Sequence, residues 1–489
     1  MSYRRAGWAV ATIFLFLCAL RSFAWLGPAA GEGQNAAAGS SFPDLIFVQT
    51  RKIVVGGLAG RFPQGSQLMR LDLAKRTAGA NKLTPRFFAA ADPQVSFDGR
   101  RVLFSAQRTP GEHWQVWEMN ADGSGQKQIT DCPADCLRPD YLPQNEIVYT
   151  ARAIRRGADE WRLVVAKNDG SGARPITFGP GDFETEAVLQ NGLMLVSASW
   201  PLDASGPQTK TRVLYTIKPD GTELETLRYE RDAAGSSTDA AELDDKSIAF
   251  ERTSADHAAE GGRLTEIKPG ALRGAPLGPQ TAMSWSPADW TGDELVVARW
   301  VTGTASNSGR FDLYSFARSS ASFARLIYSD PPFSSVQPVP LKPRPAPKWF
   351  WSLVQPEAKA ARLICLDSYL AGDEPTGRIN GTIARVRVLT FDPVSNTEKV
   401  LGEAPVEKDG SFYVAVPPDR PVRFELLDPQ GRVLRAQKSW VWARPGEDRG
   451  CAGCHQDRAV APQNEWPLTL RRFDTPTPLG VATSSRAKP

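Results

Sequence analysis

Short runs of alternating apolar and polar residues, separated by glycine-rich turns, fill most of the chain between residues 43 and 330. The clearest unit is PQVSFDGRRVLFSAQR (93–108), which is followed by WQVWEMNADGSGQKQIT (114–130). Such alternation is typical of half-buried β-strands, and Asp-Gly pairs supply the positive φ angles of tight hairpins. The pattern therefore predicts short antiparallel strands joined by turns, with few helices.

This unit occurs six times in all, at intervals of about 50 residues. An opening copy begins with PDLIFVQT (43–50), and later copies include WRLVVAKNDGSGARPIT (161–177), RVLYTIKPDGTELETL (212–227), RLTEIKPGALRGAPL (263–277) and FDLYSFARSSASFARLI (311–327). A repeat of four short strands is a propeller blade, and closing the ring hides the sheet edges. We predict a six-bladed β-propeller over residues 43–335. The motifs S-F-D-G-x-x-V-x-F and N-x-D-G-S-G-x-x-x-x-I-T resemble the TolB-type repeat, which implies a fold and no particular chemistry.

The polar turn residues and the tryptophans of the repeats are interpreted as structural. Asp122, Asp169 and Asp220 are expected to form turns rather than to act as catalytic acids. Seven tryptophans fall on or beside the predicted strands of the repeats: Trp114, Trp117, Trp161, Trp200, Trp285, Trp290 and Trp300. Most of them are expected to pack between blades, and an aromatic-lined ligand channel is the alternative. Cys132 and Cys136 are predicted to form a local disulfide, with a metal-binding pair as the second interpretation.

After the repeats the pattern changes twice. VQPVPLKPRPAPKWFW (336–351) is rich in proline and predicts an extended connector. Residues 352–448 again show short alternating strands with Asp-Gly and Pro-Gln-Gly turns, which predicts a small antiparallel β-sandwich. Cys365 lies in an apolar strand and is expected to be a buried, unreactive thiol. The fold class is therefore all-β.

The N-terminus is typical of an export signal. MSYRR precedes an apolar run over residues 6–20, and Ser22-Phe23-Ala24 offers small residues for cleavage. We predict a signal peptide over residues 1–24 and a flexible tether over 25–42. Because Arg21 lies between the apolar run and the cleavage site, the alternative is that the signal stays uncleaved and anchors the chain. Only in that case do we expect the chain to contact a membrane. The mature protein is expected to be soluble in the bacterial periplasm, or otherwise exported.

The charge balance argues against one class of partner. Lysine and arginine number 58 against 54 aspartate and glutamate residues, and three of the positive charges lie in the predicted signal peptide. The remainder is nearly neutral, so we expect no binding to nucleic acid.

The segment RGCAGCHQDR (449–458) carries the clearest chemical signal, in a chain with six cysteines and three histidines. In c-type haem proteins two cysteines of a C-x-x-C-H run form thioethers to the porphyrin, and the histidine binds the iron. We predict one covalently bound haem c on Cys451 and Cys454, with His455 as the proximal ligand, within a haem-binding segment and tail over 449–489. A zinc site would need four ligands, of which only three are local, and a Cys451–Cys454 disulfide is the remaining alternative.

The second axial ligand of the iron is not evident nearby. Downstream of residue 283 there is no methionine, and His455 is the only histidine. A histidine or methionine ligand would therefore come from the propeller: His113, His257, Met69, Met119, Met194 or Met283. Otherwise the position holds a tyrosine, such as Tyr369 or Tyr413, a lysine, water or nothing.

The run from Leu363 to Pro478 resembles the middle domain of hydrazine synthase alpha subunits. The matching features are ICLDSY (364–369), DGSF (409–412), VPPDRPV (416–422), the block W-V-W-x-R-P-G-E-x-R-G-C-x-G-C-H (440–455) and A-P-x-N (461–464). The resemblance implies a propeller followed by a domain with haem on Cys451 and Cys454. The family's haem has a tyrosine ligand just after the motif, whereas this chain has Gln, Asp, Arg and Ala at 456–459. Hydrazine chemistry is therefore not carried over.

Together these features predict an exported monohaem c-type protein for electron transfer or redox chemistry, with a redox partner protein that the sequence does not identify. One alternative is a haem enzyme whose open distal side acts on a small nitrogen or oxygen compound. Another is a binding scaffold in which the propeller holds a protein partner and the haem is secondary.

Overall fold

The computed structural model describes residues 42–481 apart from 56, 75–78, 156–157, 201–210, 228–234, 255–259, 272, 303–308, 372–375, 393–394, 396, 438, 454–465 and 473–474. The predicted signal peptide and nearly all of the predicted tether lie outside the described residues, as do Cys454, His455 and His257. Within the described residues, no helix combines the length and apolar character that crossing a membrane requires.

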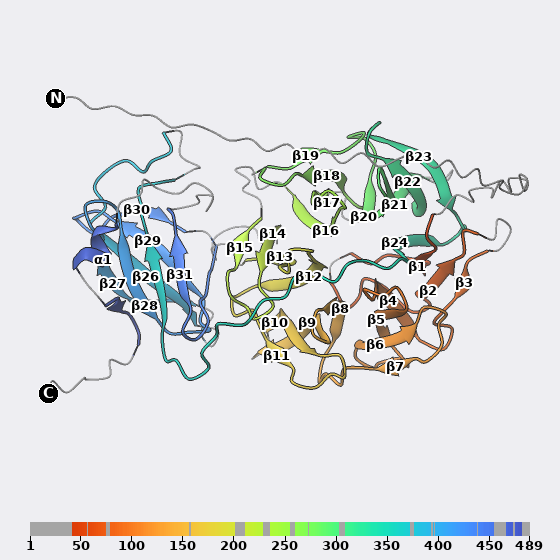
Figure 1. Cartoon of the computed structure of the whole chain (residues 1–489), viewed down its shortest axis with the longest axis horizontal. Helices are drawn as coiled ribbons and strands as arrows, with labels where there is room; N and C mark the ends of the chain where they lie inside the picture. The colour runs from red at the N-terminus through yellow and green to blue at the C-terminus, as the bar shows by residue number, and fades with distance from the viewer. Residues whose placement is uncertain are drawn as a thin grey trace, which may run out of the picture. The chain divides into compact units, whose positions relative to one another are not determined.

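The repeat region forms a β-propeller, as predicted (Figure 1). Six four-stranded sheets are described between Leu45 and Pro340. In five of these sheets the four strands follow one another along the chain. The first two sheets are β4 (Ala89–Val95), β5 (Arg101–Gln107), β6 (Gln115–Asn120) and β7 (Lys127–Gln128), and then β8 (Cys136–Leu142), β9 (Glu146–Arg155), β10 (Ala158–Lys167) and β11 (Arg174–Pro175). The next three are β12 (Asp182–Val188), β13 (Met194–Ser199), β14 (Arg212–Ile217) and β15 (Glu225–Thr226); β16 (Ser236–Glu242), β17 (Ile248–Thr253), β18 (Arg263–Ile267) and β19 (Ala275–Pro276); and β20 (Ser284–Thr291), β21 (Glu294–Thr302), β22 (Gly309–Ala317) and β23 (Ser322–Tyr328).

The remaining sheet joins the two ends of the propeller. It contains β1 (Leu45–Thr50), β2 (Gln67–Leu71) and β3 (Asn81–Lys82), and its innermost strand is β24 (Ser334–Pro340), which pairs antiparallel with β1. The innermost strands β4, β8, β12, β16, β20 and β24 contact one another in succession, so the ring closes. The predicted propeller boundary at 335 was therefore too early, because residues 336–340 belong to β24 rather than to the connector.

The repeated sequence motifs have a clear structural role. Asp122 and Asp169 accept hydrogen bonds from the backbone N–H groups of Ser124 and Ser171, each at 2.9 Å, so they form the turns as predicted. The glycine that follows each aspartate has positive φ and packs against the preceding sheet. A Cβ at Gly170 would collide with the carbonyl oxygen of Ile129. The Asp-Gly pair thus sets both the hairpin and the spacing between adjacent sheets.

The tryptophans of the repeats pack mostly in the interior, as expected. Trp114 and Trp290 are fully buried, and Trp285 stacks with Phe62 at a centroid distance of 6.1 Å. Aromatic and aliphatic side chains of this kind fill the spaces between neighbouring sheets.

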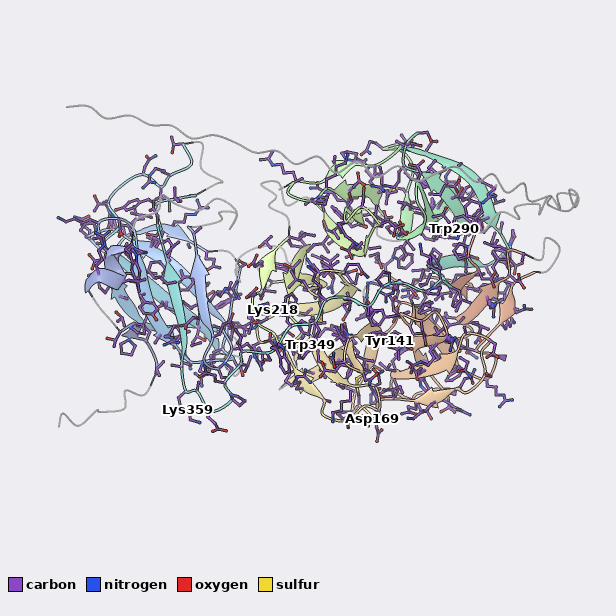
Figure 2. The ribbon with its side chains drawn as sticks, in the orientation of Figure 1. Tyr141, Asp169, Lys218, Trp290, Trp349 and Lys359 are labelled. Carbon is purple, nitrogen blue, oxygen red and sulfur yellow. A yellow bond between two sulfur atoms is a disulfide. The ribbon has the colours of Figure 1, made fainter. Side chains whose placement is uncertain are left out.

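The connector after β24 has no regular secondary structure, but it is hydrogen-bonded to the propeller. Arg344 and Lys348 donate backbone N–H groups to the carbonyl oxygens of Phe97 and Gln190. Trp349, labelled in Figure 2, packs edge-on against Trp351 at a centroid distance of 4.3 Å. The connector is therefore extended, as predicted, and it is also anchored along its length.

The second domain is a β-sandwich of two four-stranded sheets. One sheet has the order β31 (Asp448–Cys451), β25 (Ala361–Cys365), β28 (Phe412–Val416) and β32 (Thr477–Pro478). The other has the order β27 (Thr397–Pro405), β26 (Arg385–Asp392), β29 (Val422–Leu427) and β30 (Val433–Ala436). A short helix, α1 (Leu468–Arg472), precedes β32. The pairs β25–β31 and β28–β32 are parallel, so the sandwich is not wholly antiparallel.

Candidate functional site

The described part of the predicted haem segment begins inside the sandwich rather than after it. Strand β31 ends at Cys451 and lies at the edge of its sheet, in parallel register with β25. The backbone N–H of Leu366 donates to the carbonyl oxygen of Cys451 at 2.9 Å, which fixes the first cysteine of the motif. Cys451 is half-buried, whereas Cys454 and His455 lie outside the described residues.

A cavity of about 960 Å³ adjoins Cys451, between the sandwich and the propeller. Its walls are mostly apolar side chains contributed by both domains: Leu363, Phe412, Phe424, Leu426 and Val441 from the sandwich, and Leu189, Leu227, Ile248 and Ile267 from the propeller. Cys365 and Cys451 also line it. Its volume lies at the upper end of the range of about 300–1,000 Å³ that is typical of ligand and cofactor sites.

The tryptophan-rich segment before Cys451 fastens the cavity wall to the propeller. Trp442 is fully buried and packs edge-on against Phe183 and Phe178 of the propeller, at centroid distances of 5.5 and 6.0 Å. Its Nε1 donates to the carbonyl oxygen of Gly221 at 3.0 Å. The residues between 440 and 449 thus make the junction between the two domains, a role that their sequence pattern did not reveal.

Arg449 lies two residues before Cys451 and makes the second junction contact. Its guanidinium donates to the carbonyl oxygens of Trp442, at 3.1 Å, and of Leu224 in the propeller. Arg449 is 7% exposed, lines the cavity, and has a buried Nε without a hydrogen-bond partner. Nearby, burial raises the pKa of Glu447, whose carboxylate accepts the backbone N–H of Glu223 at 3.2 Å. A buried cation therefore faces the cavity beside the motif.

The described propeller residues among the predicted axial ligands do not line this cavity. Met69, Met119 and Met194 are buried inside propeller sheets. His113 is half exposed, with Nδ1 3.5 Å from a carboxylate oxygen of Asp135. Within the described part of the chain, neither a histidine nor a methionine lines the cavity, whereas Tyr215 and the lysines 246, 268 and 348 do.

Cys132 and Cys136 form a disulfide in the loop that leads into β8. This is the first of the two interpretations of the pair. The described residues contain no group of histidine, cysteine or acidic side chains suited to hold a metal ion.

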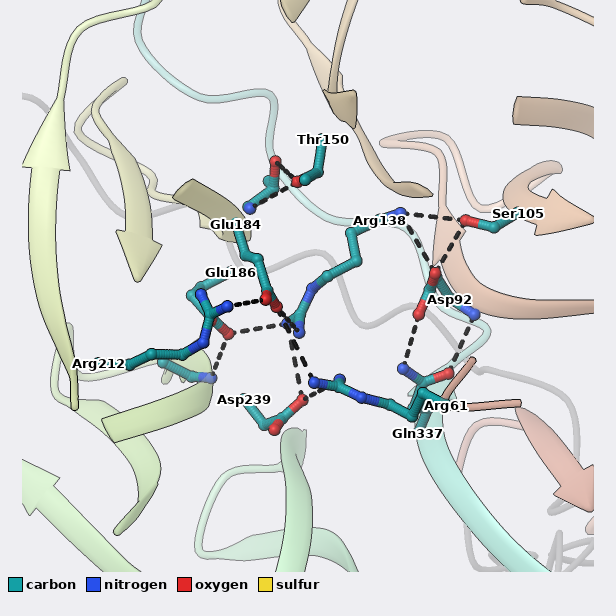
Figure 3. A network of polar contacts seen from close by, with 12 residues as sticks. Arg61, Asp92, Ser105, Arg138, Thr150, Glu184, Glu186, Arg212, Asp239 and Gln337 are labelled. Carbon is teal, nitrogen blue, oxygen red and sulfur yellow. Dashed lines mark hydrogen bonds and ion pairs between the residues drawn. The ribbon is translucent and has the colours of Figure 1, made fainter. Parts of the chain in front are cut away.

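A second polar site, on the propeller axis, was not anticipated from the sequence (Figure 3). Each innermost strand has a β-bulge at which one polar residue enters the lining of a central cavity of about 320 Å³: Asp92, Arg138, Glu186, Asp239, Ser286 and Gln337. Five of the six have φ between 50° and 54°, the exception being Glu186. Bulges turn side chains toward the axis without breaking the sheets.

Arg138 is the centre of this network. Its guanidinium lies 3.1 Å from Glu184, 2.8 Å from Glu186 and 3.6 Å from Asp239. Although burial opposes it, the charges of Arg212 and Arg138 lower the pKa of Glu184. Burial raises the pKa of Glu186 to about 7, despite its contact with Arg138. The recurrence of x-Pro at Asp92-Pro93, Arg138-Pro139, Ser286-Pro287 and Gln337-Pro338 is the sequence signal that marks most of these bulges.

Comparison with known proteins agrees with both halves of this architecture. Residues 357–456 match the family model described as the hydrazine synthase alpha subunit middle domain. Hydrazine synthase subunit alpha of Kuenenia stuttgartiensis is 22% identical over an alignment of 551 positions, which covers 84% of this chain and 65% of the relative. The match thus spans less than two thirds of the relative's own length.

A solved structure with a TM-score above 0.5 supports the same fold. The hydrazine synthase of Kuenenia stuttgartiensis aligns with a TM-score of 0.75 and 18% identity, covering 88% of this chain and 71% of that one. TolB from Acinetobacter baumannii aligns with a TM-score of 0.42 and 11% identity, covering 60% of this chain and 66% of that one. The resemblance to hydrazine synthase alpha subunits that the sequence predicted is confirmed.

Proposed function

We propose, from its resemblance to hydrazine synthase alpha subunits, that this chain is an exported c-type haem protein with a redox function. One haem would be attached through Cys451 and Cys454, with His455 as the proximal iron ligand. The observation that carries this proposal is the cavity of about 960 Å³ that adjoins Cys451. Attachment residues without adjoining space would favour a zinc or disulfide role instead.

The residues of the cavity fit a haem. The aliphatic and aromatic part of its wall would shield the porphyrin face from water, and a low dielectric there strengthens charge interactions. Arg449 offers a buried positive charge for a carboxylate group of the cofactor. The haem would supply an iron that changes its oxidation state, and the surrounding protein would set its potential through burial and hydrogen bonding. Electrons would pass to or from a redox partner protein.

The sixth coordination position favours a second candidate function. Electron-transfer haems usually carry histidine or methionine opposite the proximal ligand. No described histidine or methionine lines the cavity, and three of the propeller methionines are committed to sheet interiors. This favours an iron whose distal side is open, or bound by tyrosine or lysine, and with it a haem enzyme that acts on a small nitrogen or oxygen compound.

The disulfide supports the proposed location. Cytosolic proteins keep their thiols reduced, whereas exported proteins form and retain disulfides. The Cys132–Cys136 bridge is therefore consistent with the export signal predicted over residues 1–24.

The proposal is tested by expressing the full-length chain in a bacterial host with a cytochrome c maturation system. We expect a mature mass equal to the cleaved polypeptide plus one haem, and peroxidase-active staining after denaturing electrophoresis. Cys451→Ala combined with Cys454→Ala should abolish the staining. Cys132→Ala combined with Cys136→Ala, which removes two cysteines elsewhere, should retain it. A wild-type mass equal to that of the bare polypeptide would overturn the proposal.

The optical spectrum then separates the two candidate functions. A low-spin ferrous spectrum that carbon monoxide leaves unchanged supports electron transfer. A high-spin spectrum that changes with carbon monoxide supports a reactive, open iron site. A chain that carries no haem but retains a protein partner through its propeller supports the scaffold alternative.

A further inference from the structure

The ring of bulge residues on the propeller axis has its hydrogen bonds complete on one side (Figure 3). Gln337 Nε2 donates to one carboxylate oxygen of Asp92 at 2.8 Å, and the backbone N–H of Asp92 donates to Gln337 Oε1 at 3.0 Å. The other carboxylate oxygen of Asp92 accepts the Ser105 hydroxyl at 2.8 Å and the backbone N–H of Arg138 at 3.2 Å. This side of the ring therefore has little hydrogen-bonding capacity left for a ligand.

The other side of the ring, which we call the acceptor sector, is different. It consists of Glu186, Asp239 and Ser286, from the consecutive innermost strands β12, β16 and β20. The side chain of Asp239 is 7% exposed and lines the cavity, and its contacts with the guanidinium groups of Arg138 at 3.6 Å and Arg61 at 4.0 Å are longer than hydrogen bonds. Among the described residues, Ser286 Oγ and Glu186 Oε1 are buried without a hydrogen-bond partner. All three side chains thus have acceptor capacity that the fold leaves unused.

Unused acceptors of this kind require an explanation. A buried polar oxygen without a donor costs free energy that folding does not recover, so native proteins keep few of them. The Ser197 hydroxyl lies near Glu186, but its oxygen also has no hydrogen-bond partner in the part of the chain that the structure describes. Three such groups on neighbouring strands of one cavity wall are what a binding site for a hydrogen-bond donor would present.

The charge of the cavity lining favours a cation as that donor. Seven acidic and four basic residues line the cavity. Three of the basic residues already have acidic partners. Arg138 contacts the acidic residues of the ring, Lys342 lies 2.9 Å from Asp289, and Arg344 lies 3.4 Å from Asp140. The remaining excess of acidic residues gives the cavity a negative potential, which attracts cations and repels anions.

We propose that the acceptor sector binds the ammonium group of a small aliphatic amine. An ammonium group has three N–H donors, which matches the three acceptor residues of the sector. The lining also contains Val188, Ala240 and the prolines that follow four of the ring residues, so apolar surface is available for the alkyl chain. The cavity volume of about 320 Å³ lies at the lower end of the range of about 300–1,000 Å³ that is typical of ligand sites, which restricts the ligand to a small molecule. This inference does not depend on the haem proposed above.

A divalent metal ion fits the acceptor sector less well. Ca²⁺ takes about six to eight oxygen ligands, and Mg²⁺ requires near-octahedral geometry. The described residues contain no group of histidine, cysteine or acidic side chains suited to hold a metal ion. The guanidinium group of Arg138, 3.6 Å from Asp239, would also repel a doubly charged ion more strongly than a singly charged ammonium group.

The test is equilibrium dialysis of the full-length chain against radiolabelled 1,4-diaminobutane. We expect saturable binding of one amine per chain. Unlabelled butylamine should displace the label, whereas 1-butanol and butanoate, which have the same chain length without a positive charge, should not. Absence of saturable binding would overturn the inference, and so would displacement by butanoate at the concentrations at which butylamine acts.

Three variants locate the bound amine. Asp239→Asn keeps the size of the side chain but removes its charge, so it should weaken binding about tenfold or more. Ser286→Ala removes one neutral acceptor and should weaken binding about threefold or more. Asp131→Asn, at an exposed acidic residue outside the cavity lining, should bind as the wild type does. Equal affinities of Asp239→Asn and Asp131→Asn would place the amine elsewhere. If Asp239→Asn fails to fold, Ser286→Ala and the displacement series on the wild type decide the matter.

Two further measurements separate this site from the alternatives. Calcium chloride should displace the labelled amine no better than sodium chloride of equal ionic strength, and stronger displacement by calcium would indicate a metal site and refute the inference. The affinity should be the same for the chain produced with and without a haem maturation system. An amine that binds only to the haem-containing chain would lie at the haem, which would refute the site on the propeller axis while leaving the proposed function intact.

Discussion

Replacing Trp442 by alanine should separate the two domains energetically. The side chain is 0% exposed, and its ring packs against Phe178 and Phe183 of the propeller. Burial of a tryptophan removes about 150–250 Å² from water, which at about 25 cal/mol/Å² corresponds to roughly 4–6 kcal/mol as an upper value. The carbonyl oxygen of Gly221 also loses its donor. We expect the free energy of unfolding to fall by about 3–5 kcal/mol.

Urea unfolding followed by far-ultraviolet circular dichroism measures this loss. Because Trp442 joins the cores of the two domains, the variant should unfold in two steps where the wild type unfolds in one. Limited proteolysis of the variant should cut near residues 437–447. Trp442→Phe keeps most of the apolar contact and should lose roughly 1–2 kcal/mol. Trp351→Ala removes a side chain that is 79% exposed and should change stability by less than about 0.5 kcal/mol. Equal midpoints for Trp442→Ala and Trp351→Ala would refute the assignment of the junction.

Three further predictions concern the propeller. Gly170→Ala should cost about 2–4 kcal/mol in urea unfolding because its Cβ would strike the neighbouring sheet, whereas Gly172→Ala, which faces open space, should cost about 1 kcal/mol; equal losses would contradict the packing role. Replacing both Cys132 and Cys136 by alanine should lower the free energy of unfolding by about 2 kcal/mol, as expected for a disulfide that closes a short loop. A reductant should no longer shift the urea midpoint of this variant, and a variant midpoint equal to that of the wild type would argue against the bridge. The pKa of Glu186 is raised in the folded chain, so the free energy of unfolding should fall as pH rises from about 4.5 to 7. Glu186→Gln should remove on the order of 1–3 kcal/mol of this pH dependence, and identical profiles of stability against pH for the variant and the wild type would contradict the raised pKa.

The fold was predictable because its determinants are local. Each Asp-Gly turn carries its own capping hydrogen bond, and the flanking alternation follows from burial of one strand face, so each unit can be recognised without knowing its neighbours. Strand β24 was assigned to the connector because Pro338 and Pro340 resemble linker residues. In the fold, Pro338 follows the bulge residue Gln337, where a missing N–H is tolerated.

The candidate site was predictable only in part. The motif at 451–455 is contiguous, so a haem site could be predicted from its spacing, and this stays a prediction. The neighbour of Cys451 could not, because Cys365 reaches it through a parallel pairing of distant strands, which leaves no trace in sequence spacing. The network around Arg138 draws single residues from separate sheets, so no stretch of sequence contains it.

The pairing of β24 with β1 imposes an order on biosynthesis. The sheet that begins at Leu45 lacks its innermost strand until the ribosome has made residues 334–340, nearly 300 positions later. Until then the inner edge of β1 has no partner strand and the ring cannot close. Completion of the circle and delivery of the connector to its place on the propeller are consequently one event, so a chain cut short before residue 340 would lose both.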